Sequence, residues 1–174
     1  DNAELQFALI TPVAYVQLNA RNPLRTIATV TNPAGIINTP WLAGMVFVLD
    51  EREDLRELGA ARGKNVVALS PLGLGGWLSA VREWRTLGID VERDFASVRF
   101  VFSYSQVVSE VCEGRADIGV LPGSGLQSEG VFCEKELRTL PAPGAVQDAR
   151  YPLPVSTRLY PEVPFVVIGN VDES

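Results

Sequence analysis

Four short turns in the sequence combine glycine or hydroxyl-bearing residues with the expected start of a helix. Such a turn presents backbone N–H groups at the positive end of a helix dipole, where an anion or a carboxylate is stabilised. Each turn follows an apolar segment of strand length, and open α/β sheets bind ligands at the carboxyl ends of their strands. Each turn alone is explained equally well as a helix cap or a tight connection, but their joint occurrence predicts a binding site. The turns are Thr11-Pro12, Gly73-Leu74-Gly75-Gly76-Trp77, Ser103-Tyr104-Ser105 and Gly123-Ser124-Gly125.

Binding of nucleotides or nucleic acids has no support in the sequence. The glycine-rich turn at 73–77 lacks the Gly-Lys-Ser/Thr of a P-loop and the spacing of a dinucleotide-binding fingerprint. The 174-residue chain carries a net charge of -6 and has a pI near 4.7. Nucleic acids and anionic membrane surfaces need a basic patch, so we expect neither as a partner.

Side chains that could carry out catalysis are scarce. Histidine is absent, which excludes His-dependent triads, histidine zinc sites and histidine proton relays. The acidic residues at 51–57 and 90–94 fit solvated surfaces, and Asp117 alone lies inside an apolar strand, where it could serve the structure or face a cleft. A lysine base remains formally open, but we predict a non-enzymatic domain without a metal or a cofactor.

The chain has two cysteines, Cys112 and Cys133. Two residues are too few for a disulfide framework in a chain large enough to be stabilised by burial. We expect two reduced thiols; one disulfide between neighbouring helices and a redox or ligand-sensing role are the alternatives.

Apolar segments of strand length alternate with segments of helical period, which predicts an α/β fold with a mostly parallel sheet. The segment 74–87 should form a helix whose apolar face packs Val81 and Trp84 on the sheet. Shorter helices are expected after Thr11, over 53–58 and from Ser103 to about Glu113. Buried strands are expected at Leu5–Ile10, Asn65–Ser70, Ser97–Phe102 and Ala116–Leu121, with further strands at 24–31, 44–49, 137–140 and 164–168.

The order of these elements predicts two lobes. Residues 49–140 would form a continuous lobe, and residues 1–48 and 141–174 would form a second one from the two ends of the chain, with the strands at 44–49 and 137–140 crossing between them. The sequence has no run of about 18 apolar residues and no opening signal peptide. It begins at Asp1 and enters an apolar run at once, so we expect an excised piece of a longer protein.

Several of these blocks, in this order and spacing, resemble the phosphate/phosphonate-type periplasmic binding proteins. The blocks are Arg62–Pro71, the helix to Leu87, Leu87–Phe95, Glu113–Val120 and Ser156–Phe165. The last of them is most similar to the periplasmic sensor regions of histidine kinases of the tetrathionate-sensor type.

This resemblance implies a type II periplasmic binding fold whose two lobes close on a ligand. The segments that open the family's first lobe have no counterpart here, so that lobe should be incomplete or completed by another copy in a homodimer. The family's Ser-Thr-Ser-Gly loop is Gly73-Leu74-Gly75-Gly76 in this chain, so the backbone amides remain and the hydroxyl donors do not. We therefore expect a ligand more apolar than phosphonate, such as a small carboxylate capped by the ring of Trp77 or Tyr104.

We predict a periplasmic ligand-sensing domain of a two-component sensor histidine kinase in the inner membrane, bound to the membrane only through the rest of that protein. The alternatives are the solute-binding component of an ABC transporter and an enzyme on the same fold. The ligand would be a small anion or carboxylate in a cleft between the lobes. The residues expected to bind it are Thr11, Tyr15, Gly75, Gly76, Trp77, Ser103, Tyr104, Ser105 and Ser124.

Overall fold

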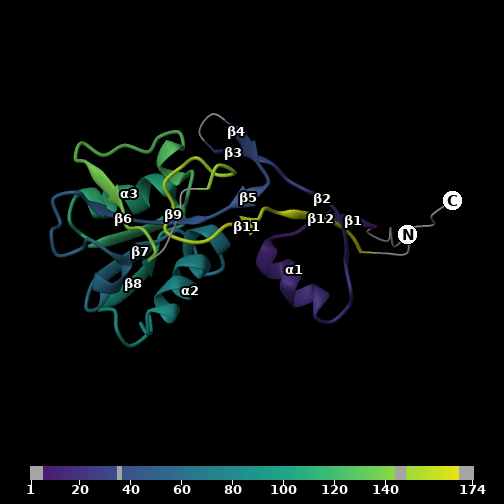
Figure 1. The fold of residues 1–174 in the computed structure, drawn as a ribbon, viewed down its shortest axis with the longest axis horizontal. Helices are drawn as coiled ribbons and strands as arrows, with labels where there is room; N and C mark the ends of the chain where they lie inside the picture. The colour runs from purple at the N-terminus through teal and green to yellow at the C-terminus, as the bar shows by residue number, and fades with distance from the viewer. Residues whose placement is uncertain (1–5, 35–36, 144–147, 169–174) are drawn as a thin grey trace.

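The computed structural model describes residues 6–34, 37–143 and 148–168, which form an α/β structure with a five-stranded and a three-stranded sheet (Figure 1). The larger sheet and its helices are built from the middle of the chain, and the smaller sheet from both ends. The helices are α1 (Pro12–Asn19), η1 (Leu58–Ala61), η2 (Leu74–Leu78), α2 (Ser79–Thr86), α3 (Tyr104–Cys112) and η3 (Gly125–Gln127). The strands are β1 (Phe7–Leu9), β2 (Arg25–Thr29), β3 (Asn32–Ala34), β4 (Ile37–Thr39), β5 (Trp41–Leu42), β6 (Gly44–Leu49), β7 (Asn65–Ala68), β8 (Ser97–Phe100), β9 (Ile118–Pro122), β10 (Leu137–Thr139), β11 (Tyr160–Pro161) and β12 (Pro164–Val167).

The five-stranded sheet has the order β10-β6-β9-β7-β8 and is mixed. β7 pairs in parallel with both β8 and β9, as expected for the middle strands. β6 pairs antiparallel with β9 and with β10, so the expectation of a mostly parallel sheet is wrong for this half. The reason is that β6 enters the sheet at Gly44, opposite Pro122 at the carboxyl end of β9, and must therefore run against it.

Both faces of the five-stranded sheet are covered, which explains why β6 is apolar and buried along its whole length. On one face, α2 places Val81 (6% exposed) and Trp84 (0%) in the core, as its apolar stripe predicts. The predicted helix 74–87 differs at its start, because residues 74–78 form a π-helical turn before α2 begins. The other face is covered by α3, whose Val107, Val108 and Val111 are buried.

The charged segment 53–58 does not form the predicted helix. It consists of turns, followed by the short helix η1. Arg138 explains the difference, because its guanidinium group donates hydrogen bonds to the backbone carbonyl oxygens of Arg52 (2.9 Å) and Leu55 (3.1 Å). A contact across the fold thereby occupies acceptors that a local helix would need for its own backbone.

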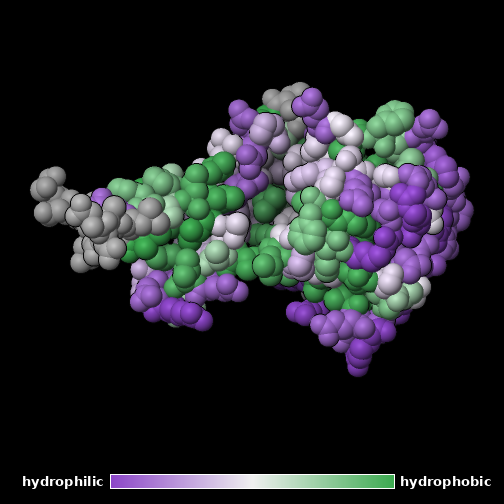
Figure 2. Space-filling model, turned by 180° about the vertical axis from the view of Figure 1, so that it is seen from behind, coloured by the Kyte–Doolittle hydropathy of each residue, from purple (hydrophilic) through white to green (hydrophobic). Residues whose placement is uncertain are grey.

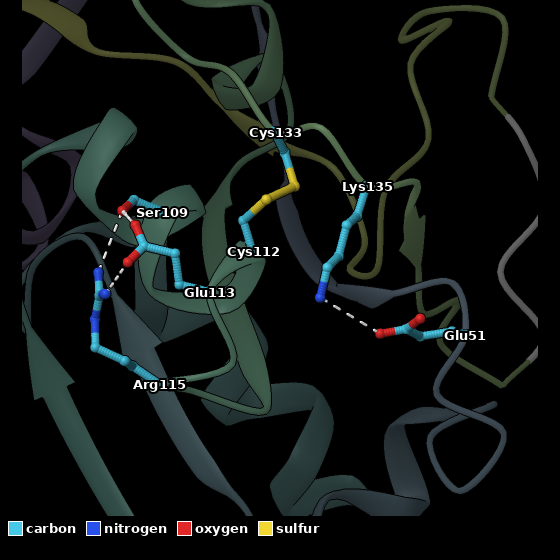
Figure 3. The surroundings of a disulfide bond; sticks show 7 residues. All are labelled: Glu51, Ser109, Cys112, Glu113, Arg115, Cys133 and Lys135. Carbon is cyan, nitrogen blue, oxygen red and sulfur yellow. Dashed lines mark hydrogen bonds and ion pairs between the residues drawn. A yellow bond between two sulfur atoms is a disulfide. The ribbon is translucent and has the colours of Figure 1, made fainter.

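The predicted reduced cysteines are wrong: Cys112 and Cys133 form a disulfide (Figure 3). Cys112 is the last residue of α3, and Cys133 follows η3, so both lie in the part built from the middle of the chain. Their Cα atoms are 5.8 Å apart, within the range that a disulfide bridges. The fold of the intervening segment, rather than the number of cysteines, creates this proximity.

The three-stranded antiparallel sheet has the order β1-β12-β2 and carries α1. Thr11 caps α1 as predicted, since its hydroxyl accepts a hydrogen bond from the N–H group of Ala14. The expected burial of the first strand is wrong: Phe7 is 39% and Leu9 is 60% exposed. None of the residues of α1 is buried either. One short helix cannot cover this sheet, and Figure 2 shows apolar residues at the surface over the narrow part of the molecule.

The chain passes between the two sheets through β5 and β11, which pair antiparallel (Figure 1). The strands at 44–49 and 137–140, which we expected to cross between lobes, lie inside the five-stranded sheet as β6 and β10. The returning chain is attached there by two side chains. The hydroxyl of Thr157 accepts from the N–H group of Gly44, and that of Ser156 accepts from the N–H group of Val46, both at 2.8 Å.

Candidate functional site

Three of the four predicted turns lie at one edge of the five-stranded sheet. Because β7, β8 and β9 are parallel, the segments that follow them emerge at the same side. The glycine-rich turn follows β7, Ser103 follows β8 and Ser124 follows β9. The sequence therefore assembles a common edge from segments up to about fifty residues apart.

Asp117 lies at the opposite edge of the sheet. Its carboxylate accepts hydrogen bonds from the N–H group of Asn65, at the start of β7, and from Arg52. Burial acts to raise the pKa of Asp117, but these hydrogen bonds and the charge of Arg52 lower it overall. Of the two roles left open for Asp117, the structure supports the structural one.

Ser103, Tyr104 and Ser105 form the start of α3. The hydroxyl of Ser103 accepts a hydrogen bond from the N–H group of Gln106 at 3.4 Å and lies 3.1 Å from the hydroxyl of Ser105. Ser103 is thus the predicted cap of α3. The two hydroxyl groups lie together at the positive end of the helix dipole, where they can donate to an acceptor.

The glycine-rich turn packs closely against the strand that leads into the sheet. A Cβ atom on Gly75 would lie 2.8 Å from the Cδ1 atom of Leu42, and one on Gly76 would lie 3.1 Å from the Cβ atom of Leu69. Trp77 does not lie at the surface: it is 7% exposed, and its ring packs edge-on against Phe100. The expectation that Trp77 caps a ligand is therefore not supported by its position in the core.

Two residues that the sequence analysis did not identify, Tyr151 and Glu162, lie near Tyr104 and the turn at 123–125. Tyr151 packs against the turn at 123–124, since a Cβ atom on Gly123 would lie 2.7 Å from its hydroxyl oxygen. Tyr104 lies close to the turn at 125, because a Cβ atom on Gly125 would be 3.1 Å from its ring. Burial raises the pKa of both tyrosines, and the negative charge of Glu162 raises each of them further.

Glu162 is a buried carboxylate in the segment that follows β11. Its position is fixed by the hydrogen bond from its own N–H group to the carbonyl oxygen of Pro40 at 2.8 Å. Tyr151 and Glu162 both belong to the proline-rich end of the chain, in the stretches Tyr151-Pro152 and Tyr160-Pro161-Glu162. The prolines in these two stretches predict a rigid backbone that carries aromatic and acidic side chains. This pattern does not show which segments of the chain lie next to Tyr151 and Glu162.

Phe102 is a second residue that the sequence analysis misplaced. We expected it at the end of a buried strand, but β8 ends at Phe100 and Phe102 is 72% exposed. Its φ angle is +56°, in the left-handed region that non-glycine residues rarely adopt. The hydrogen bond from its N–H group to the carbonyl oxygen of Leu69 holds this turn. Residues held in such sparsely populated backbone conformations cluster at functional sites.

Thr11 and Tyr15 lie on α1, beside the three-stranded sheet (Figure 1). Within residues 6–34, 37–143 and 148–168, these two residues form hydrogen bonds within α1: Thr11 caps the helix, and its carbonyl accepts from the N–H group of Tyr15. Both residues therefore belong to the part of the molecule with the three-stranded sheet, and the other three turns belong to the five-stranded sheet. Their role in a shared cleft remains a prediction.

The described residues contain no group of three or more His, Cys, Asp or Glu side chains placed to hold a metal ion. In the same residues, no helix is both long enough and apolar enough to cross a membrane.

Comparison with known proteins connects the chain with periplasmic binding proteins. The chain is 26% identical over 176 residues to the tetrathionate sensor histidine kinase TtrS of Salmonella typhimurium, covering 98% of this chain and 28% of that protein. Its fold matches that of XAC2383 from Xanthomonas citri bound to ATP, with a TM-score of 0.70 and 17% identity over 97% of this chain and 59% of the other. It also matches a binding protein component of an ABC phosphonate transporter from Pseudomonas aeruginosa, with a TM-score of 0.63 and 12% identity over 98% of this chain and 53% of that one.

The chain thus spans less than two thirds of each of these relatives. The match to a family is nonetheless complete along this chain: residues 1–174 fit the family described as ABC transporter, phosphonate, periplasmic substrate-binding protein. The resemblance inferred from the sequence blocks is confirmed. The chain belongs to the phosphonate-type periplasmic substrate-binding protein family.

Proposed function

We propose that this chain is the periplasmic ligand-sensing domain of a two-component sensor histidine kinase. The observation that carries the proposal is that Tyr104 and Tyr151, from separate parts of the chain, both pack against the turn Gly123-Ser124-Gly125 at the carboxyl edge of the five-stranded sheet. The similarity to a sensor histidine kinase over 98% of the chain supports the signalling role.

The disulfide supports a periplasmic location. Disulfides persist in oxidising compartments, of which the bacterial periplasm is one, and are rare where thiols are kept reduced. The bridge between Cys112 and Cys133 joins α3, which begins at the proposed site, to the loop after η3. The match to a periplasmic family is consistent with this location.

The chemistry of the edge favours a small carboxylate that also carries a hydrogen-bond donor. The hydroxyl groups of Ser103 and Ser105 at the start of α3 suit a negatively charged group, since donors and the helix dipole act together there. The buried carboxylate of Glu162 repels a second negative charge and accepts a hydrogen bond from a ligand hydroxyl or ammonium group. The amides of Gly75 and Gly76 are the remaining donors of the predicted set.

In this proposal the aromatic surface of the site comes from Phe102 and Tyr104. Phe102 is exposed, and Tyr104 is partly exposed, whereas Trp77 has its ring in the core. The ring of Phe102 stands next to Ser103 in the chain, so an apolar part of a ligand can lie on it while a carboxylate reaches the start of α3.

We further propose that the parts built around the two sheets act as two lobes, with β6 belonging to the lobe of the five-stranded sheet rather than to the lobe of residues 1–48 and 141–174 expected from the sequence. The pairing of β5 with β11 forms a narrow connection between the two sheets (Figure 1), which suits hinge closure about short segments. Closure would bring Thr11 and Tyr15 toward the edge. A ligand shifts this equilibrium only by binding the closed form more tightly than the open form.

The test is calorimetric titration of the protein with oxyanions and with small hydroxy and amino carboxylates. Replacing Tyr104 by alanine should weaken binding of any compound that binds at the edge by about tenfold or more, and S103A should weaken it by loss of a charge-assisted hydrogen bond. The matched control is R93A, which removes an exposed arginine elsewhere on the same part of the molecule. Unchanged affinity in both Y104A and S103A would contradict the proposed site.

The family itself favours a second candidate, the solute-binding component of an ABC transporter. The two functions differ in what ligand binding does. In the full-length protein in membrane vesicles, a sensor kinase changes its rate of autophosphorylation from ATP when the ligand is added. A transporter component shows no autophosphorylation and instead supports ATP-dependent uptake of the ligand.

A further inference from the structure

A cavity of about 620 Å³ lies between α2 and the returning segment. Its walls come from Trp41 in β5, Glu83 in α2, and residues of the segments 141–143 and 148–159. This volume is in the range of pockets that hold small organic molecules. None of the residues predicted to bind a ligand lines it.

The charged side chains of the cavity fall into two groups. Arg150 is held firmly: its Nε and Nη2 atoms donate to both carboxylate oxygens of Asp148, at 3.0 Å and 2.6 Å. These hydrogen bonds lower the pKa of Asp148 to about 2. The guanidinium group of Arg150 also lies over the ring of Trp41, 4.6 Å from its centre. The charges of Arg150 and Asp148 are therefore already paired with each other, and these two side chains form a fixed part of the cavity wall.

Arg158 is held loosely by comparison. Its Nε atom lies 3.5 Å from the Oε1 atom of Glu83, which is too long for a good hydrogen bond, and its side chain is 57% exposed. Glu83 is a buried carboxylate that has a second partner, Arg82, at 3.2 Å. Arg158 can therefore turn to another carboxylate while Glu83 keeps an ion pair.

The charged side chains that line the cavity are two arginines, Arg150 and Arg158, and two acids, Glu83 and Asp148. Because Arg150 and Asp148 pair with each other and Glu83 has Arg82 as a second partner, the guanidinium group of Arg158 is the charge that can turn to a ligand. Apart from Thr157, whose hydroxyl accepts from the N–H group of Gly44, the uncharged residues of the wall are apolar. Its apolar side chains include Pro141, Pro143, Leu153, Val155 and Leu159.

We propose that this cavity is a second binding site, which takes a monocarboxylate with an apolar body. The carboxylate pairs with the guanidinium group of Arg158, whose planar fork matches its two oxygens. The apolar body lies against the prolines and leucines and beside Trp41. Because Trp41 is in β5 and Arg158 is just before β11, the ligand contacts β5 and the segment that leads into β11, which together connect the sheets.

The experiment titrates the protein with acetate, benzoate and benzylamine, using calorimetry and tryptophan fluorescence. Trp77 and Trp84 are buried in the core, so a change in fluorescence should come from Trp41 and be lost in W41F. Benzoate should bind about tenfold or more tightly than acetate, because it buries a ring. R158A should weaken benzoate binding by about 10- to 100-fold, the loss expected for a hydrogen bond to a charged group.

R158K, which retains the charge without the planar fork, should bind benzoate more tightly than R158A and less tightly than the unchanged protein. R93A is the matched control for loss of an arginine, and circular dichroism verifies the fold of each variant. Absence of benzoate binding, tighter binding of benzylamine than of benzoate, or equal affinity in R158A would each overturn the proposal. Loss of benzoate binding in Y104A but not in R158A would also overturn it, because binding would then belong to the carboxyl edge.

Discussion

Replacing Cys112 and Cys133 by serine should lower the free energy of unfolding by about 3 kcal/mol at 25 °C. The two residues are 21 positions apart in the chain and joined by a disulfide. In the chain-entropy description, cutting a loop of this length restores about 11 cal/mol/K of entropy to the unfolded state. For a domain of this size, a loss of about 3 kcal/mol in the free energy of unfolding corresponds to a decrease of about 6–12 °C in the thermal midpoint.

The folded state should keep its structure in this variant, because α3 is anchored independently of the disulfide. Val107, Val108 and Val111 of α3 are buried against the five-stranded sheet. Near-UV circular dichroism at 25 °C should therefore match that of the unchanged protein, and the effect should appear only in the unfolding transition. Urea titration gives the free energy, and thermal unfolding gives the midpoint.

The control is K135A in the same loop. Lys135 lies two residues after Cys133 and forms an exposed ion pair with Glu51 at 3.6 Å (Figure 3). Exposed pairs of this kind contribute little, so K135A should shift the midpoint by less than about 2 °C. C112S, C133S and the double variant should be equally destabilised, since breaking either end opens the loop. A double variant as stable as the unchanged protein under oxidising conditions would refute the reasoning.

Three further perturbations test the packing and the ion pairs. G119A should destabilise the protein by about 1–3 kcal/mol in urea titration, because a Cβ atom there would lie 2.2 Å from the ring of Phe47; a neutral effect would contradict this packing. S156A should cost about 1–3 kcal/mol by the same measurement, since the buried hydroxyl both accepts from the N–H group and donates to the carbonyl of Val46. The pKa of Asp117 is lowered in the fold, despite the opposing effect of burial, so its contribution is present above the unfolded pKa and is lost as the pH falls below about 4. D117N should therefore reduce the decrease in thermal midpoint on acidification, and an identical pH profile would show that Asp117 contributes nothing.

Local patterns in the sequence were enough to identify many of the elements. The strand at Gly44–Leu49 and the burial of Val81 and Trp84 follow from runs and spacings of apolar residues. The caps at Thr11 and Ser103 follow from hydroxyl side chains placed just before a helix. These features depend on residues a few positions apart, so they can be inferred without knowing which distant segments meet.

The candidate site shows the limit of that inference. Three predicted turns do lie at one edge, because parallel strands bring their carboxyl ends together. Tyr151, which packs against the turn at 123, comes from the returning chain, and nothing in the local sequence around it indicates which turn it contacts. Trp77 shows the reverse case, since a ring next to a glycine-rich turn was expected to cap a ligand and lies in the core.

The sequence by itself determined the alternation of strands and helices, the apolar faces, the caps and the membership of the periplasmic binding family. Only the tertiary structure decided the antiparallel direction of β6, the disulfide, the left-handed turn at Phe102 and the separate cavity at Arg158. The physical reason is distance along the chain. Helix periodicity and capping act over a few residues, whereas strand direction, the pairing of two cysteines and the walls of a cavity depend on where remote segments return.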